Sequence, residues 1–224
     1  MLTTLVVVVK LKFEHYNLLF PILLICALAI ILKKYKVSKD YRIAFFVLLA
    51  INFICFVMPD KTVYRLRNNH RYFWSERPLG LSHFKIRRNT ENDTTGIVNP
   101  TIIGSISKVY NFPPAIIFAS DNNERSWIDT TSFDDSPESK KSLNILLEHE
   151  KRHLDIMEIY VSRAQDSVNK MIFYSYGQKY EVVKHYFELS EKVQKAFDAE
   201  TDHGTIDREI EKWNKKITLL LNKK

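Results

Sequence analysis

The hydrophobic pattern divides the chain into two long uncharged segments and a longer region of shorter apolar stretches. Residues 16–32 and 43–59 are each 17 residues long and carry no charged side chain. A helix that crosses a bilayer needs about 17–25 mostly apolar residues. The two segments therefore predict a two-helix membrane hairpin, with a pair of buried core helices as the alternative. We expect a membrane anchor over residues 1–59 and a separate domain over residues 60–224.

Short apolar stretches between turn residues predict strands in the first part of the second domain. The clearest stretches are residues 72–74, 81–86, 115–119 and 126–128. The third of these follows Pro113 and Pro114, and its uninterrupted apolar character is typical of a buried strand.

The last third of the chain has apolar residues at three- and four-residue steps, which predict helices. Ser136 followed by Pro137 is a start signal, because a hydroxyl caps the helix and proline suits its first turn. This helix is expected to run to about residue 168, and two more are expected over residues 179–199 and 208–221. Strands followed by helices predict an α+β fold class.

Charge is distributed unevenly within the net +7 of the 224-residue chain. Residues 1–59 hold seven basic and two acidic side chains, and residues 60–88 hold eight basic and two acidic. Positive charge beside the apolar segments favours contact with anionic lipid headgroups, so we expect a membrane as partner and no nucleic acid. Basic residues flank both ends of the second segment, so charge alone does not decide which side of the membrane the domain occupies. Both cysteines, Cys26 and Cys55, lie in the apolar segments, which excludes a thiol nucleophile or cysteine-based zinc site in the second domain.

The segment His149-Glu150-Lys151-Arg152-His153 lies within the first predicted helix. Residues four apart share one helix face, so the imidazoles of His149 and His153 can bind one metal ion. In such an H-E-x-x-H motif the ion is zinc, and the carboxylate of Glu150 acts as general base towards a zinc-activated water.

The alternative interpretation of the same segment is a solvated helix face that contains two histidines. Opposite charges at i,i+4, Glu148 with Arg152 and Lys151 with Asp155, are typical of such a face.

Zinc requires a third protein ligand from outside the motif. The metzincin pattern is excluded, because Ile156 and Ile159 occupy the positions of its glycine and histidine. His203 is the preferred candidate by its chemistry, and Glu200, three residues earlier, is the alternative. His185 on the second predicted helix is a weaker candidate.

Four segments together resemble a bacterial family of predicted secreted zinc-dependent proteases: residues 118–129 (FASDNNERSWID), 146–165 (LLEHEKRHLDIMEIYVSRAQ), 197–204 (FDAETDHG) and 211–217 (EKWNKKI). The resemblance covers roughly residues 72–217 and implies a zincin-like fold. His149, Glu150 and His153 match the zinc motif of the family, and Glu200 and His203 match its later segment. The family's secreted character implies that the second domain lies outside the cytoplasm, anchored by two spans in the inner membrane of a bacterium.

The function predicted from these features is a membrane-anchored zinc metallopeptidase that hydrolyses a peptide or protein substrate. An exposed edge strand, residues 115–119 or 126–128, is expected to bind the extended substrate, unless both are core strands. The candidate donors of a hydrogen bond to the developing oxyanion are Tyr174, Tyr176, Tyr180 and Arg152.

The same sequence features allow two functions other than a metallopeptidase. The alternative is a catalytically inactive zincin-like binding module at the membrane surface, against which the intact Glu150 argues. An intramembrane protease is disfavoured, because the motif lies in a charged helix about 90 residues beyond the last apolar segment.

Overall fold

The computed structural model describes residues 71–74, 79–87, 96–106 and 115–223, with the isolated residues 38, 43, 47, 50, 62 and 68. The chain divides into two compact units, Met1–Asn68 and Asn69–Lys224. Almost all described residues belong to the second unit, which contains short strands followed by three long helices. This mixed composition agrees with the predicted α+β class.

The predicted membrane hairpin, and the two-span inner-membrane location built on it, are corrected. Within the described residues no helix combines the length and the apolar character that crossing a bilayer requires. The longest helix, α5 (Pro137–Lys170), has 34 residues, but charged side chains recur along it, which a lipid-exposed helix avoids. Residues 16–32 and 43–59 themselves lie outside the described residues, apart from Ile43, Val47 and Ala50.

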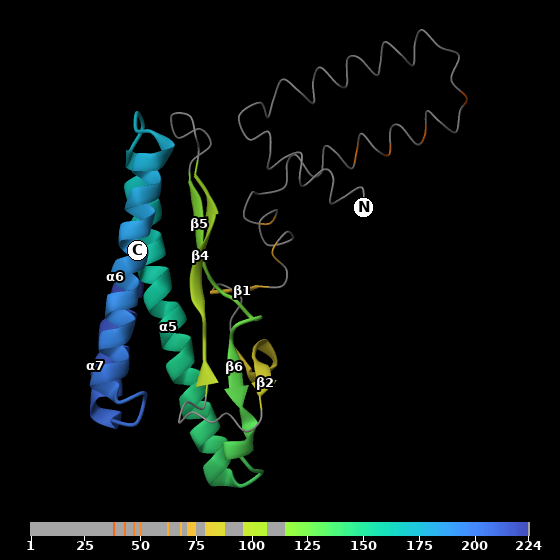
Figure 1. Cartoon of the computed structure of the whole chain (residues 1–224), viewed down its shortest axis with the longest axis vertical. Coiled ribbons are helices and arrows are strands. Elements are labelled where there is room, and N and C mark those ends of the chain that lie inside the picture. Colours follow the sequence, from red (N-terminus) through yellow and green to blue (C-terminus); the bar gives the residue numbers. More distant parts are fainter. Residues whose placement is uncertain are drawn as a thin grey trace. The chain divides into compact units, whose positions relative to one another are not determined.

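The strands form two small three-stranded sheets (Figure 1). In the first, β5 (Ile116–Asp121) pairs antiparallel with β1 (Tyr72–Phe73) on one side and with β4 (Pro100–Ser105) on the other. In the second, β6 (Trp127–Asp129) lies between β2 (Lys85–Arg87), which is parallel to it, and β3 (Gly96–Ile97), which is antiparallel.

The strand order corrects the predicted substrate-binding edge. Residues 115–119 and 126–128 fall on β5 and β6, and each of these strands has a partner on both sides. Both are therefore core strands, as the alternative interpretation held. The edge strands are β1 and β4 in the first sheet and β2 and β3 in the second. Two residues, Val98 and Asn99, connect β3 with β4 along the chain.

Strand β4 did not stand out in the sequence, because Pro100 and Gly104 interrupt its apolar run. The glycine has a steric reason: a Cβ added to Gly104 would lie 2.1 Å from the carbonyl oxygen of Ile116 on β5. The predicted strand over residues 81–86 is in part a short 3₁₀ helix, Leu81–His83, and β2 begins only at Lys85.

The helices begin at capped residues. Ser136 accepts a hydrogen bond from the Ser139 amide at the start of α5, as the Ser-Pro signal predicts. Helix α6 (Tyr176–Thr201) begins three residues before the expected position 179, at a capping box formed by Ser175 and Gln178. Helix α7 (Asp207–Leu221) starts one residue before the prediction.

Helix α5 lies at the centre of the unit, with the strands on one side and α6 and α7 on the other (Figure 1). Its apolar residues enter three core clusters, one against β5, one against the second sheet, and one against the two following helices. The third cluster matters for the site, because its member Phe197 packs against the rings of His149 and His153. Its fully buried members are Ile156, Ile159, Phe197, Trp213 and Ile217.

The connection between β3 and β4 is fixed by a buried polar cluster. The amide of Asn99 donates to the carboxylate of Asp121 and to the hydroxyl of Ser126, at 2.9 Å each, and the Ser126 hydroxyl donates to the same carboxylate. Burial raises the pKa of Asp121, against the lowering effect of these hydrogen bonds. The cluster fixes the backbone at Val98 and Asn99, and residues 96–100 line one side of a pocket over α5.

Candidate metal centre

The two histidines of the motif are buried on α5 and do not belong to a solvated face. His149 and His153 are each 7% exposed, and Glu150 is 5% exposed. The neighbouring charges form different pairs from those expected: Lys151 binds Glu148, and Arg152 binds the buried Asp155, both at 2.8 Å. The interpretation of the motif as a solvated face is therefore wrong.

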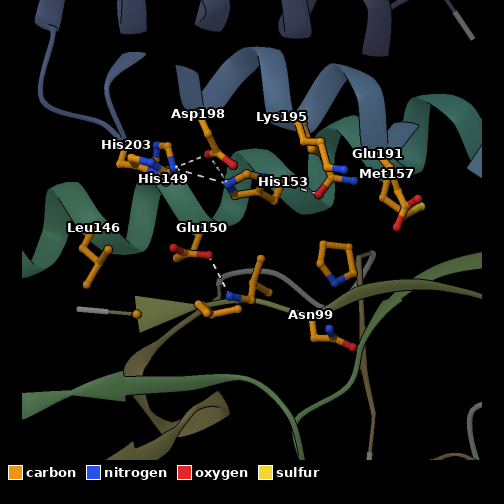
Figure 2. Close-up of a pocket in the computed structure, with 15 residues that line it drawn as sticks. Asn99, Leu146, His149, Glu150, His153, Met157, Glu191, Lys195, Asp198 and His203 are labelled. Carbon is orange, nitrogen blue, oxygen red and sulfur yellow. Dashed lines mark hydrogen bonds and ion pairs between the residues drawn. The ribbon is translucent and has the colours of Figure 1, made fainter. Parts of the chain in front are cut away.

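Three ligand atoms converge between α5 and α6 (Figure 2). The Nε2 atoms of His149 and His153 lie 3.3 Å apart, and Oδ1 of Asp198 lies 3.1 Å from the first and 3.0 Å from the second. Ligand atoms bound to one zinc ion at about 2.0–2.1 Å in a tetrahedron lie about 3.3 Å from each other. The spacing thus fits a single ion bound by all three side chains.

The chemistry of the three atoms also suits a metal ion. The amide oxygen of Gln194 lies 3.2 Å from Nδ1 of His153 and accepts its proton, which leaves the lone pair on Nε2. This lone pair and the carboxylate oxygen of Asp198 lie 3.0 Å apart and repel unless a proton or a metal ion lies between them. His149, His153 and Asp198 can accordingly hold a metal ion.

The pKa shifts show the same convergence of negative charge. Burial opposes the charged form of His153, but the hydrogen bond to Asp198 and the charge of Glu150 outweigh it and raise its pKa. Burial likewise works to raise the pKa of Asp198, yet its bonds to the two histidines hold the pKa well below its usual range. The site therefore attracts positive charge, which a metal ion would supply.

The end of α6 positions Asp198. The backbone carbonyl of Asp198 accepts hydrogen bonds from the amides of Asp202 and His203, the latter at 2.9 Å, in the manner of a Schellman motif. The carbonyl of Thr201 in turn accepts from the amides of residues 204, 205 and 206. The backbone around Asp198 is thus fixed by the way the helix ends.

Phe197 and Gly204 position the ring of His149. The ring of Phe197 stacks on it with centroids 4.6 Å apart, and meets the ring of His153 edge to face at 5.4 Å. A Cβ added to Gly204 would lie 3.0 Å from Nδ1 of His149, and the backbone of Gly204 has φ +89°. This Nδ1 is buried and has no hydrogen-bond partner among the described residues. On its Nδ1 side the His149 ring is therefore held by packing, whereas Nε2 faces Asp198 at 3.1 Å.

Glu150 lies beside the ligand group without joining it. Its Oε2 accepts a hydrogen bond of 2.7 Å from the amide of Val98, at the connection between β3 and β4. No second partner is recorded for the carboxylate among the described residues, so its other oxygen is available to a water or substrate. The bond to Val98 couples the position of the carboxylate to the strand edge across the pocket.

The pocket has a volume of about 590 Å³ and a lining of both polar and apolar side chains. One wall consists of residues 96–100, and the other carries side chains of α5 and α6 (Figure 2). The two predicted third ligands differ in their placement. His203 lines the pocket but does not belong to the group of converging ligand atoms. Glu200 does not line it, and its carboxylate accepts a hydrogen bond from the indole of Trp213 at 2.8 Å.

The four expected oxyanion donors are not found in the pocket. Tyr174, Tyr176 and Tyr180 lie between the end of α5 and the first turn of α6, and they are exposed. Arg152 is bound to Asp155. None of the four is among the residues that line the pocket.

Asp198 is the site residue that the sequence analysis missed, although it lies in the segment 197–204 that supplied the two other candidates. A signal was present: Glu191, Gln194, Lys195 and Asp198 recur at three- and four-residue steps, which places them on one face of α6. The structure shows that this face lines the pocket.

Gly204→Ala is expected to lower zinc affinity about 10–100-fold, the usual effect of disturbing groups that orient a ligand. The added methyl would press on the His149 ring, and alanine is unfavourable at φ +89°. Isothermal titration with zinc measures the effect. The matched control is Gly177→Ala, since a Cβ at Gly177 meets nothing within 4 Å. Equal zinc affinities of the two variants would show that Gly204 does not orient His149.

Comparison with protein-family models, with curated proteins and with solved structures finds no match to this chain. The resemblance to a protease family consequently stays a prediction from its motifs.

Proposed function

We propose that the second unit is a zinc-dependent metallopeptidase. The observation that supports this proposal is the convergence of His149 Nε2, His153 Nε2 and Asp198 Oδ1 within 3.3 Å of one another, next to a carboxylate that is not a ligand. Catalytic zinc sites use three protein ligands and keep the fourth position for water or substrate. Two imidazoles and one carboxylate also suit ferrous iron, but Glu150 favours the hydrolytic metal, since it supplies a base for a bound water.

The chain's own residues can carry the proton transfers of peptide hydrolysis. A zinc ion, when bound, supplies a water of lowered pKa and polarises the substrate carbonyl. Glu150 takes one proton from this water as the water oxygen attacks the carbonyl carbon. The same carboxyl group then gives the proton to the amine nitrogen as the carbon–nitrogen bond breaks. The Val98 amide keeps Glu150 in place during both transfers.

The edge formed by β3 and β4 suits an extended peptide. Residues 96–100 line the pocket opposite the ligand group, and neither strand has a second strand partner within the described residues. A peptide that pairs with this edge would pass between it and α6, across the position of the metal.

The second candidate function is a binding module with a structural metal. A structural zinc site has four protein ligands and no open position, and His203, which lines the same pocket, is the candidate for the fourth. The metallopeptidase and the binding module therefore differ in what His203 binds.

Metal analysis and a peptidase assay on the purified full chain test the proposal. We expect about one zinc per chain, the number that one such site provides. We also expect hydrolysis of a fluorescence-quenched peptide library that 1,10-phenanthroline abolishes and zinc restores. A protein that binds no zinc even when zinc is supplied contradicts the metal site, and iron in its place contradicts the peptidase. Stoichiometric zinc without hydrolysis of any peptide in the library would favour the binding module.

A further inference from the structure

The loop that follows α6 has an unusual backbone. Asp202, His203 and Gly204 have φ of 46°, 53° and 89°, so three successive residues adopt the left-handed region. Residues other than glycine normally enter this region singly. Hydrogen bonds to the carbonyls of Asp198 and Thr201 fix the loop in this form, so the backbone sets the direction in which the His203 side chain leaves the chain.

The imidazole of His203 has no binding partner in the described part of the chain. No hydrogen bond or ion pair is recorded for either ring nitrogen there, and the side chain is exposed while it lines the pocket. The neighbouring Gly204 lies against the ring of His149. His203 itself lies beside His149 in the close-up of the pocket (Figure 2). A histidine on a fixed backbone beside the candidate metal centre, without a partner in the described part of the chain, is available to a ligand in the pocket.

The developing oxyanion of peptide hydrolysis needs such a group. When the water oxygen bonds to the carbonyl carbon, the carbonyl electron pair moves onto oxygen, and a positioned N–H donor stabilises the negative charge. The ligand group offers no N–H for this purpose, because its Nε2 atoms face the metal position. Lys195 also lines the pocket, but it lies on the part of α6 that faces His153 and not His149.

We propose that His203 is the catalytic residue that donates a hydrogen bond to the substrate oxyanion, and that it is not a ligand of the metal. This inference rests on the proposed peptidase function. His203 donates through a ring N–H, which the neutral imidazole possesses, and it takes no part in the proton transfer by Glu150. When the amine leaves, the substrate carbonyl group becomes the carboxylate of the product. His203 neither gains nor loses a proton in the reaction.

The test compares His203→Ala and His203→Gly with wild type in the full chain. Glycine removes the side chain and also suits the left-handed backbone, so a folding defect confined to the alanine variant can be recognised. The control is His185→Ala, which removes an exposed histidine of α6 that does not line the pocket. Each protein is assayed for zinc affinity, kcat and KM on the peptide library, and binding of phenylphosphonate, a tetrahedral anion, to the zinc-loaded form.

Both His203 variants are expected to bind zinc within about twofold of wild type, to lose kcat by about 10²–10³-fold, and to keep KM. Their affinity for phenylphosphonate is expected to fall about 10–100-fold, the effect of losing a hydrogen bond to a charged group. His185→Ala is expected to match wild type throughout. A loss of zinc affinity above tenfold in both His203 variants would make His203 a ligand and overturn the inference, as would unchanged kcat or unchanged phosphonate binding. If wild type hydrolyses no peptide, the peptidase proposal fails separately, and the phosphonate measurement alone decides whether His203 binds anions.

Discussion

Glu150→Gln is expected to lower kcat for peptide hydrolysis by a factor of about 10²–10⁴, the usual contribution of a general base. The amide keeps the size of the side chain and an oxygen that can accept the Val98 amide proton, so the pocket should retain its shape. It removes only the basic lone pair that receives the proton of the attacking water. Zinc should still bind with wild-type stoichiometry, because none of the three converging ligand atoms is changed.

The matched control is Glu148→Gln, two residues earlier on α5. Glu148 is exposed and pairs with Lys151 on the surface, so its loss should leave both zinc content and kcat unchanged. Zinc content is measured on the same samples as activity, which separates loss of the base from loss of the metal. If Glu150→Gln retains full activity on a peptide that wild type cleaves, the base is another group and the mechanism proposed here fails.

Asp198→Ala is expected to lower zinc affinity by at least about a hundredfold, and hydrolysis with it. Losing a group that merely orients a ligand costs about 10–100-fold in affinity, so losing a ligand itself should cost more. The change also removes the only negative charge in the converging group and leaves two imidazoles one helical turn apart. Competition with a chromogenic zinc chelator measures the affinity.

Glu200→Ala serves as the control, because it removes a second carboxylate from the same turn of α6. Its carboxylate binds Trp213 instead of facing the ligand group, so zinc affinity should stay within about twofold of wild type, with only the modest loss of stability that one hydrogen bond brings. Loss of zinc in Glu200→Ala and retention in Asp198→Ala would reverse the assignment and restore the ligand set with Glu200.

The sequence was informative where the physical cause is local. The start of α5 follows from Ser136 and Pro137 alone, and the pairing of His149 with His153 follows from helical periodicity within five residues. The predicted start of α6 at residue 179 is too late. Gly177, a residue type that is unfavourable in helices, lies between the two members of the capping box, Ser175 and Gln178.

The third metal-binding residue could not be identified in the same way. Which face of α6 meets α5 depends on how Phe197 packs against both histidine rings, and this packing is a property of the tertiary structure. By residue type alone, His203 was a better candidate than Asp198. The strand edge over the pocket was misplaced for a related reason, since the order of strands in a sheet does not follow from their apolar character, and β4 contains a proline and a glycine.

The candidate metal ligands come from two different helices, α5 and α6, and this has a consequence for stability. His149 and Asp198 are 49 residues apart in the chain and come together only when α5 and α6 pack, so an unfolded chain offers at most the two histidines to an ion. If zinc occupies the site as proposed, unfolding releases it, and the free zinc concentration becomes a variable of the folding equilibrium. Above the dissociation constant, each tenfold rise in free zinc would add about 1.4 kcal/mol to the free energy of unfolding. A cell compartment poor in zinc would thus lower the amount of folded protein as well as its activity.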